Sequence, residues 1–247
     1  MSEFERSALL LTQKGIDRLA AAHVVIFGVG GVGSYAVEAL ARAGVGHFTL
    51  VDPDTVSQSN CNRQLVAMHS TLGQYKVDVA KAHILDINPN AQVDAQRLFY
   101  TVENADSLPL QKFDYIVDAI DTISAKIELI VRAKQANIPI ICAMGCGNKL
   151  DPTRFVVTDL YKTTFDPVAK ILRHELRKRN ISSLKVVYST EPARTPLAAE
   201  NTVPAPFGAK RQTPGSVSFV PGVAGLILAG VVVREISDNL LDDEHKT

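Results

Sequence analysis

The chain has 247 residues, enough for one large α/β domain, and 46% of them are apolar, so a sizeable core can form. Lysine plus arginine and aspartate plus glutamate number 26 each, so any affinity for nucleic acid must come from a local excess of charge. Three cysteines are too few for a disulfide scaffold and the charged N-terminus is no signal peptide, so we expect a cytoplasmic protein.

Strand and helix patterns alternate along the first 145 residues, which is typical of a parallel sheet covered by helices on both faces. The patterns predict strands at 23–28, 47–52, 92–98, 113–118 and 138–143, and helices at 31–43, 74–87 and 123–136. Beyond residue 146 we predict a strand, a basic helix and another strand, at 154–160, 166–179 and 184–189. The expected fold class is α/β: a doubly wound, Rossmann-like, mostly parallel sheet with a C-terminal strand and helix extension.

The last part of the chain has two contrasting segments. Residues 189–215 hold five prolines and predict a long crossover loop, a length that is usually functional. The apolar stretch 219–233 is shorter than the roughly 20 residues that span a bilayer, so we expect a buried core or interface helix over 221–236.

The segment "VVIFGVGGVGSYAVEALARAG" indicates a nucleotide site. Gly28, Gly30, Gly31 and Gly33 fit G-x-G-x-x-G between a strand and a helix, where backbone N–H groups can bind phosphate. Asp52 ends the next strand, 24 residues after Gly28, at the usual place of a carboxylate that binds ribose. These features do not distinguish a nicotinamide cofactor from another nucleotide.

The residues that follow favour a triphosphate. Arg63 and Lys76 flank the start of the third predicted helix, with Asn60 and Gln64 beside Arg63. A triphosphate carries more negative charge than a pyrophosphate and needs such cations, together with a carboxylate for Mg²⁺.

Two acidic residues end the fourth predicted strand, in the segment "DYIVDAIDT". Asp118 and Asp121 are expected to face the same crevice as the glycine turn. Asp121 is also a candidate N-cap for the helix that begins "ISAKIELI".

Together these motifs resemble those of the ubiquitin-activating-enzyme superfamily, which includes the activators of molybdopterin and thiamine sulfur carriers. The matching pieces are "GVGGVGS", "LVDPDTVSQSNCNRQ", "GQYK" and "DAIDT", in order, within residues 5–145. The resemblance implies one adenylation domain that binds ATP and activates a carboxylate. Its parts are an N-terminal helix, a nucleotide-binding core, a substrate extension and an acidic tail, at 1–22, 23–145, 146–240 and 241–247.

The resemblance also implies a role for each matching residue. Asp52 corresponds to the ribose ligand, Asp54 to a polar neighbour of the site, and Asp121 to the carboxylate linked to Mg²⁺. Asn60, Arg63 and Lys76 correspond to phosphate ligands, and Gln64 and Asp118 complete the cofactor-binding set. Arg6 matches an arginine that this superfamily inserts into the partner subunit's ATP site, which implies a homodimer.

The cysteines argue against a thioester mechanism. No C-x-x-C pair for structural zinc is present, and residues 189–215 contain no cysteine. Cys61 has no histidine close by in sequence, which favours a packing role over a nucleophile.

The remaining sequence resembles one bacterial branch, the enzymes that dehydrate threonylcarbamoyladenosine in tRNA. The resemblance lies in "GCGNKLDPTRFVVTDLYKTTFDPVAKILRHELRKR" and "LKVVYSTEP". It implies adenylation of the threonyl carboxylate, ring closure by the neighbouring carbamoyl group and loss of AMP, a route that uses no cysteine.

The local charge agrees with an RNA substrate. Residues 161–187 contain seven lysines and arginines against two acids, a net charge of +5. The expected tRNA-binding residues are Lys162, Lys170, Arg173, Arg177, Lys178 and Arg179, off an apolar stripe of Val168, Ile171, Leu172 and Leu176. Arg194, Lys210 and Arg211 on the proline-rich stretch could add to this surface, and the sequence shows no evident aromatic platform for base stacking.

Other interpretations stay open at this point. A sulfur-carrier activator would need a protein partner with a diglycine tail, and an NAD-binding module would bind NAD without ATP turnover. A monovalent cation near "CAMGCGN" and a sulfur-transfer protein partner are two further expectations that the sequence leaves undecided.

Overall fold

The computed structural model describes residues 3–196 and 214–237. Its strands form one seven-stranded sheet in the order β3-β2-β1-β4-β5-β7-β6, in which β6 pairs antiparallel with β7 and the other pairs are parallel. The strands are β1 His23–Phe27, β2 His47–Val51, β3 Gln92–Gln96, β4 Tyr115–Asp118, β5 Ile140–Ala143, β6 Phe155–Asp159 and β7 Lys185–Ser189. The expected doubly wound, mostly parallel sheet is therefore confirmed.

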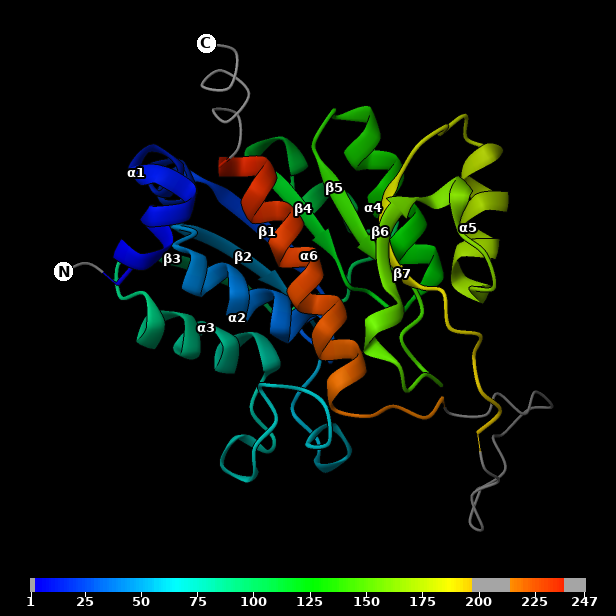
Figure 1. Cartoon of the computed structure of the whole chain (residues 1–247), viewed down its shortest axis with the longest axis horizontal. Coiled ribbons are helices and arrows are strands. Elements are labelled where there is room, and N and C mark those ends of the chain that lie inside the picture. The colour runs from blue at the N-terminus through cyan, green and yellow to red at the C-terminus, as the bar shows by residue number, and fades with distance from the viewer. Residues whose placement is uncertain (1–2, 197–213, 238–247) are drawn as a thin grey trace.

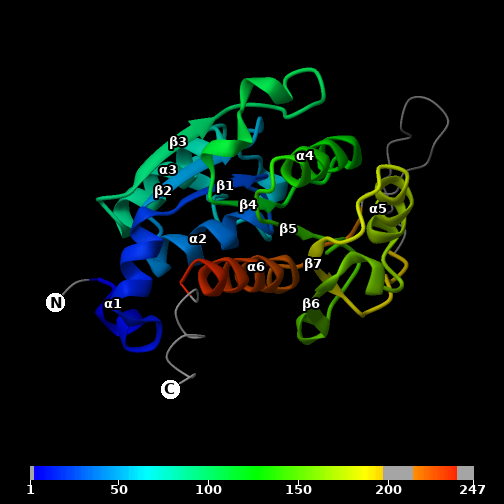
Figure 2. The ribbon, with the colours of Figure 1, turned by 90° about the horizontal axis from the view of Figure 1, so that it is seen from above.

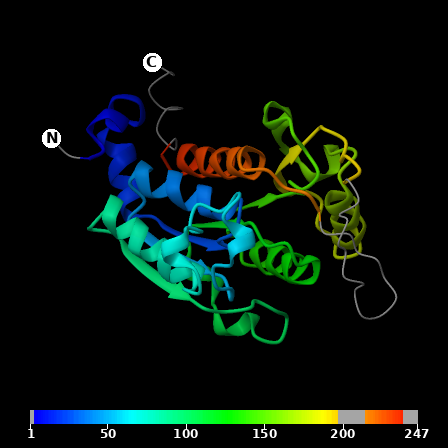
Figure 3. The same cartoon turned by 90° about the horizontal axis from the view of Figure 1, so that it is seen from below.

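Within the described residues, six α-helices cover the two faces of this sheet (Figures 1 and 2). They are α1 Glu5–Ala21, α2 Gly33–Ala43, α3 Lys76–Ile87, α4 Ile123–Gln135, α5 Pro167–Arg177 and α6 Phe219–Ser237. Buried side chains of α1, α2, α3 and α6 form one core with the face of the sheet that these helices cover. Those of α4 and α5 form a second core on the other face. Figure 3 shows the ribbon of α4 on that face, seen from below.

The central strands bury both faces, which explains their continuous apolar sequences. β1 reads "HVVIF" and its last four residues are buried, with Val24 paired to Phe48 of β2 and to Tyr115 of β4. The edge strand β3 instead has exposed and half-buried side chains.

The apolar C-terminal helix belongs to the core. α6 is the one described helix that is long and apolar enough to cross a membrane, yet it packs along α2 and against α1 (Figure 1). Val220, Ala224 and Leu228 on its inner side are fully buried. The prediction of a buried helix is confirmed, and the helix extends to Ser237.

This topology brings several loops to one edge. β2, β1, β4 and β5 are neighbours and parallel, so the loops that follow them meet at the carboxyl edge of the sheet. The loop of residues 52–75 projects below the sheet in Figure 1. The candidate site lies along this edge.

Candidate active site

Two glycines shape the turn between β1 and α2. Gly28 has a φ of 88°, and a Cβ there would lie 2.6 Å from the carbonyl oxygen of Ala119. A Cβ on Gly33 would lie 1.7 Å from the carbonyl oxygen of Gly28, so neither position accepts a side chain. At Gly30 a Cβ would meet only the Gln64 amide nitrogen, 3.8 Å away, among the described residues. The turn therefore leaves space for a ligand beside Gly30.

The turn also presents free backbone donors. The N–H of Val29 donates to Asp52 Oδ2 at 2.7 Å and is not available to a ligand. In the described part of the chain, the N–H groups of Gly30, Gly31 and Val32 find no backbone or side-chain acceptor. These three donors, at the start of α2, form the kind of site that binds phosphate oxygens.

Asp52, Asp54 and Lys76 form a charged cluster beside the turn. The Lys76 ammonium donates to Asp54 Oδ2 at 2.6 Å and lies 3.9 Å from Asp52 Oδ1. Burial raises the pKa of Asp52 above its ordinary value, and the Lys76 charge opposes that shift. The cluster places a buried cation at the N-terminus of α3, next to the glycine turn.

The loop with Arg63 also packs against the turn. The Arg63 Cγ lies 3.5 Å from where a Cβ on Gly31 would be, while its Nη1 donates to the Ser59 carbonyl oxygen at 3.0 Å. Gln64 is buried, and its Oε1 accepts no hydrogen bond from the described residues. The structure therefore brings Arg63 and Gln64 to the glycine turn, as the sequence predicted.

Asn60 has a local role in the same loop. Its Oδ1 accepts from the N–H of Ser57 at 3.1 Å and closes the short turn of residues 58–60. A second anchor of this loop, which sequence reasoning missed, is the hydrogen bond from Leu65 N–H to Ser34 Oγ in α2, at 3.1 Å.

Asp118 does not face the crevice, so its expected place there is corrected. Its side chain is fully buried, and Oδ2 accepts from the Lys126 ammonium at 2.7 Å. Its Oδ1 accepts from the Ile120 N–H at 3.1 Å, and Lys126 also donates to the Ala143 carbonyl oxygen at 3.1 Å. A buried carboxylate needs such a partner, so Asp118 and Lys126 hold the ends of β4 and β5 together. Lys126 was missed because a lysine within a helix ordinarily predicts a solvated face.

Asp121 is exposed on the loop that follows β4. The N-cap of α4 is Thr122 without a side-chain capping bond, so the alternative interpretation of Asp121 as the cap is wrong. The described residues contain no group of three histidine, cysteine or acidic side chains that could hold a metal. The Asp121 carboxylate accepts only a long hydrogen bond from Thr122 Oγ1, at 3.5 Å, among the described residues. One such exposed carboxylate at the edge of a phosphate site fits Mg²⁺, which usually binds one or two carboxylates together with phosphates.

The loop after β5 holds a second buried lysine. Lys149 donates to the carbonyl oxygen of Gly145 at 2.5 Å and lies 3.4 Å from Asp166 Oδ2. Asp166 also accepts from the Gly145 N–H at 3.1 Å, which ties this loop to the start of α5. Burial raises the pKa of the neighbouring Cys146 thiol to about 12, so this cysteine is protonated and a poor nucleophile at neutral pH.

Arg6 lies far from the glycine turn of its own chain. It is exposed in the first turn of α1, and the ring of nearby Phe4 packs against Gly44, which ends α2. The 11 residues of α2 separate Gly44 from the turn at Gly33 by about 16 Å.

The basic residues around α5 are only partly available. Arg173 donates to the carbonyl oxygen of Thr163 at 3.0 Å, and Lys178 and Arg179 pair with Glu175 at 2.9 and 2.8 Å. The remaining three expected tRNA ligands are exposed without an ion pair among the described residues: Lys162, Lys170 and Arg177.

The buried stripe of α5 also differs from the predicted one. It consists of Ala169, Leu172 and Leu176, whereas Ile171 is 45% exposed. Arg194 pairs with Glu191, and Lys210 and Arg211 lie outside the described residues.

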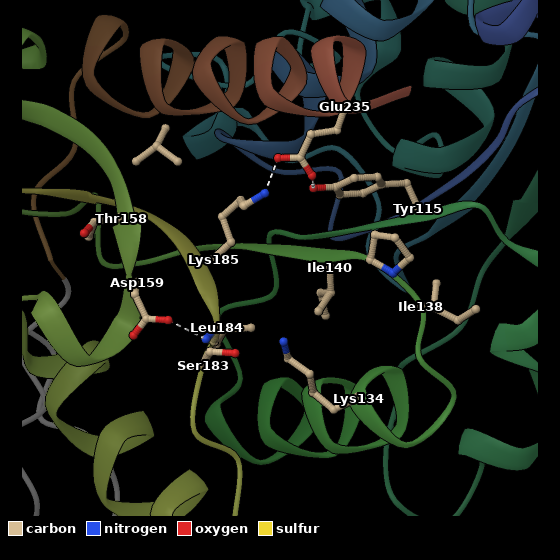
Figure 4. A pocket seen from close by; sticks show the side chains of 12 residues that line it. Tyr115, Lys134, Ile138, Ile140, Thr158, Asp159, Ser183, Leu184, Lys185 and Glu235 are labelled. Atoms are coloured by element: carbon tan, nitrogen blue, oxygen red, sulfur yellow. Dashed lines mark hydrogen bonds and ion pairs between the residues drawn. The ribbon is translucent and has the colours of Figure 1, made fainter. Parts of the chain in front are cut away.

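A separate cavity of about 470 Å³ opens at the opposite edge of the sheet (Figure 4). Tyr115, Ile140 and Lys185 line it at the amino ends of β4, β5 and β7, and Glu235 of α6 accepts hydrogen bonds from Tyr115 and Lys185. Ligands of doubly wound sheets bind at the carboxyl ends of strands, so this cavity is not the nucleotide site.

The carboxyl edge thus has the features of a nucleotide-binding site built on a doubly wound sheet, with backbone donors left free within the described residues and a buried lysine for phosphate. The chain belongs to the ThiF family, whose profile matches residues 4–246. A sequence comparison and a structure comparison both match the chain to the same kind of enzyme within this family. The tRNA threonylcarbamoyladenosine dehydratase of Bacillus subtilis is 44% identical over 244 residues, covering 96% of this chain and 95% of that protein. The Escherichia coli dehydratase of the same name, in complex with ATP, matches with a TM-score of 0.87 at 31% identity, covering 98% of this chain and 96% of that chain.

A relative from another branch matches less of the chain. The molybdopterin-synthase adenylyltransferase of Haemophilus influenzae is 35% identical over 170 residues, 66% of this chain. The resemblance that the sequence motifs predicted is confirmed.

Proposed function

We propose that the chain uses ATP to dehydrate threonylcarbamoyladenosine in tRNA to a cyclic product. The observation that carries this proposal is the full-length similarity to the Bacillus subtilis dehydratase, which includes the strands and basic helix beyond the nucleotide core. The similarity to a dehydratase crystallised with ATP favours ATP over NAD as the bound nucleotide. We extend the proposal to the location of the protein: an enzyme that modifies cytoplasmic tRNA would work in the cytoplasm.

The chemistry explains why such an enzyme needs no nucleophile of its own. An oxygen of the threonyl carboxylate attacks the α-phosphorus of ATP, a C–O–P bond forms and pyrophosphate leaves. A nitrogen or oxygen of the carbamoyl group then attacks the activated carbonyl carbon, AMP leaves and a proton is lost. The nucleoside loses one water, and ATP becomes AMP and pyrophosphate. The protonated Cys146 fits a route without a thioester.

We propose the following roles for the chain's residues in this reaction. The N–H groups of Gly30 and Gly31, with Arg63 and Lys76, would bind phosphate oxygens and offset the charge that develops there. We propose that Asn60 binds phosphate through its side-chain nitrogen, because its side-chain oxygen already accepts the hydrogen bond from the Ser57 N–H. Asp52 would bind the ribose, with Asp54 holding Lys76 and Gln64 offering its unpartnered oxygen.

We propose Mg²⁺ as the metal and Asp121 as its protein ligand. A bound Mg²⁺ supplies positive charge to the phosphates. The exposed Asp121 carboxylate fits this role because it follows β4 at the same edge as the glycine turn. A monovalent cation at the 142–148 loop has less support, because the Lys149 ammonium already contacts the Gly145 carbonyl oxygen.

We also propose a homodimer in which Arg6 reaches the partner's nucleotide site. Arg6 cannot reach the glycine turn of its own chain, since it lies at the far end of α2. Leu9 and Leu10 on the same helix are each 82% exposed, and exposed apolar side chains of this size indicate a contact surface.

The experiment is to incubate the protein with ATP, Mg²⁺ and tRNA that carries threonylcarbamoyladenosine. Mass spectrometry should show the loss of one water from the nucleoside with release of AMP. Lys76→Met should lower the rate by about 10²–10³-fold, whereas Lys81→Met on the same helix should leave it near the parent value. Pyrophosphate exchange that depends on a diglycine-tailed protein instead of tRNA would support the sulfur-carrier alternative. A requirement for an added sulfur-transfer protein would identify that partner.

A further inference from the structure

Phe165 has an unusual backbone and an unusual exposure. Its φ is 55°, in the left-handed region that bulky residues rarely adopt, and its side chain is 74% exposed. The ring therefore gains little burial in return for the unfavourable backbone conformation. Such a residue indicates a function when the surrounding structure holds it in place.

Asp166 holds Phe165 in this conformation. Asp166 is buried and caps α5, because its Oδ1 accepts from the Ala169 N–H at 2.9 Å. Its Oδ2 accepts from the Gly145 N–H at 3.1 Å, which fixes the residue next to the loop after β5. The chain that follows Phe165 is thus anchored and continues into a capped helix, while the ring itself projects into solvent.

The same contacts place Phe165 at the edge of the sheet that carries the nucleotide site. Gly145 lies two residues beyond the end of β5, and β5 is separated from β1 only by β4. Neighbouring strands lie about 5 Å apart, so the ends of β1 and β5 are about 10 Å apart along this edge. The ring and the glycine turn can therefore contact one substrate.

The surroundings of the ring are basic. Lys162 and Lys170 flank Phe165 in sequence, are exposed and form no ion pair within the described residues. The neighbouring acid, Asp166, is buried with its oxygens engaged. An exposed aromatic ring that is flanked in sequence by exposed lysines, unpaired among the described residues, fits an unstacked nucleobase with its phosphates better than an apolar protein surface.

We propose that Phe165 is a stacking platform for an unpaired nucleobase of the tRNA loop, with Lys162 and Lys170 contacting the flanking phosphates. This inference rests on the tRNA substrate proposed above and departs from the sequence analysis, in which no aromatic platform was evident. The substrate adenosine is thereby presented at the carboxyl edge by stacking as well as by backbone contacts.

The test uses three substitutions at Phe165 in the full chain. Phe165→Gly should leave the melting temperature unchanged or higher, because glycine accepts the positive φ, yet lower kcat/KM for modified tRNA by about 5- to 100-fold. Phe165→Trp should keep near-parent activity, and Phe165→Leu should lose it like glycine. Val156→Ala, on the exposed side of β6, serves as the control and should match the parent.

A binding measurement separates this inference from the proposed reaction. The probe is a set of anticodon stem-loop RNAs, each with 2-aminopurine at one loop position. At one of these positions the fluorescence should fall when the RNA binds the parent protein, and it should not fall when the RNA binds Phe165→Gly. Phe165→Gly with parent kcat/KM and parent quenching would overturn the proposal. Full activity of Phe165→Leu would refute stacking, because it would show that Phe165 makes only an apolar contact, such as one with a protein partner. If the fluorescence is quenched but no AMP is released, the proposed reaction is refuted and the stacking proposal is not.

Discussion

The buried pair of Asp118 and Lys126 gives the sharpest prediction about stability. Both side chains are at most 2% exposed, and Lys126 donates to Asp118 and to the Ala143 carbonyl oxygen. Lys126→Met keeps the apolar stem but leaves the Asp118 carboxylate buried without its cation. Removal of one partner from such a pair costs about 3–5 kcal/mol. At about 2–4 °C per kcal/mol for a chain of this size, the melting temperature should fall by about 6–20 °C.

The matched variants test this reasoning by thermal and urea unfolding. Asp118→Asn combined with Lys126→Met removes both charges and should recover most of the lost stability, because the amide oxygen introduced by the first substitution can still accept from the Ile120 N–H. Lys134→Met, on the same helix and in no ion pair of the described residues, should stay within about 0.5 kcal/mol of the parent. A fall of less than about 2 °C for Lys126→Met, or no recovery in the double variant, would refute the account.

The remaining predictions concern the basic helix and the dimer. Glu175→Gln should remove the ion pairs of Lys178 and Arg179, although Arg179 also donates to the Glu175 backbone carbonyl oxygen at 2.7 Å. The salt dependence of tRNA binding should steepen by about 0.7–0.9 in slope for each added phosphate contact; an unchanged slope contradicts this. In the parent, hydrogen bonds from Arg179 and Lys178 lower the pKa of Glu175 to about 2. Their stabilising effect is therefore present above the ordinary pKa and lost only as pH falls through about 2, so this carboxylate should cause no change in binding from about pH 5 to 8. An equal mixture of Arg6→Ala and Lys76→Met proteins, unfolded and refolded together, should regain about a quarter of parent activity if Arg6 acts in trans, and none if it acts in cis.

Local sequence signals predicted most of the elements and the nucleotide edge. Period and turn chemistry act over a few residues, so "VVIFGVGGVGSYAVEAL" was enough to predict β1, the glycine turn and α2. The turn at Gly28 and Gly33 accepts no side chain, and this steric requirement is visible as glycine spacing. Arg63, Gln64 and Lys76 reach that turn because they follow β2, which is the parallel neighbour of β1.

Partners distant in sequence could not be predicted in this way. Asp118 was expected in the crevice, but its carboxylate pairs with a lysine in the next helix, which also donates to a carbonyl of β5. The sequence predicts Arg173 as a free cation, whereas in the folded chain it donates to the carbonyl oxygen of Thr163. Whether a charged side chain binds substrate or serves the fold depends on what tertiary packing places beside it.

The α/β class, the order of strands and helices and the phosphate-binding turn can all be predicted from the chain alone, since they follow from local periodicity and from sterics at glycine. Which charges remain free along the carboxyl edge is visible only in the folded molecule, because burial and pairing depend on contacts between distant segments. Phe165 illustrates both cases. The sequence "KTTFDPVAK" shows that an aromatic residue is present. Its exposed position near Gly145 depends on the hydrogen bond from the Gly145 N–H to Asp166, which lies 21 residues later in the chain.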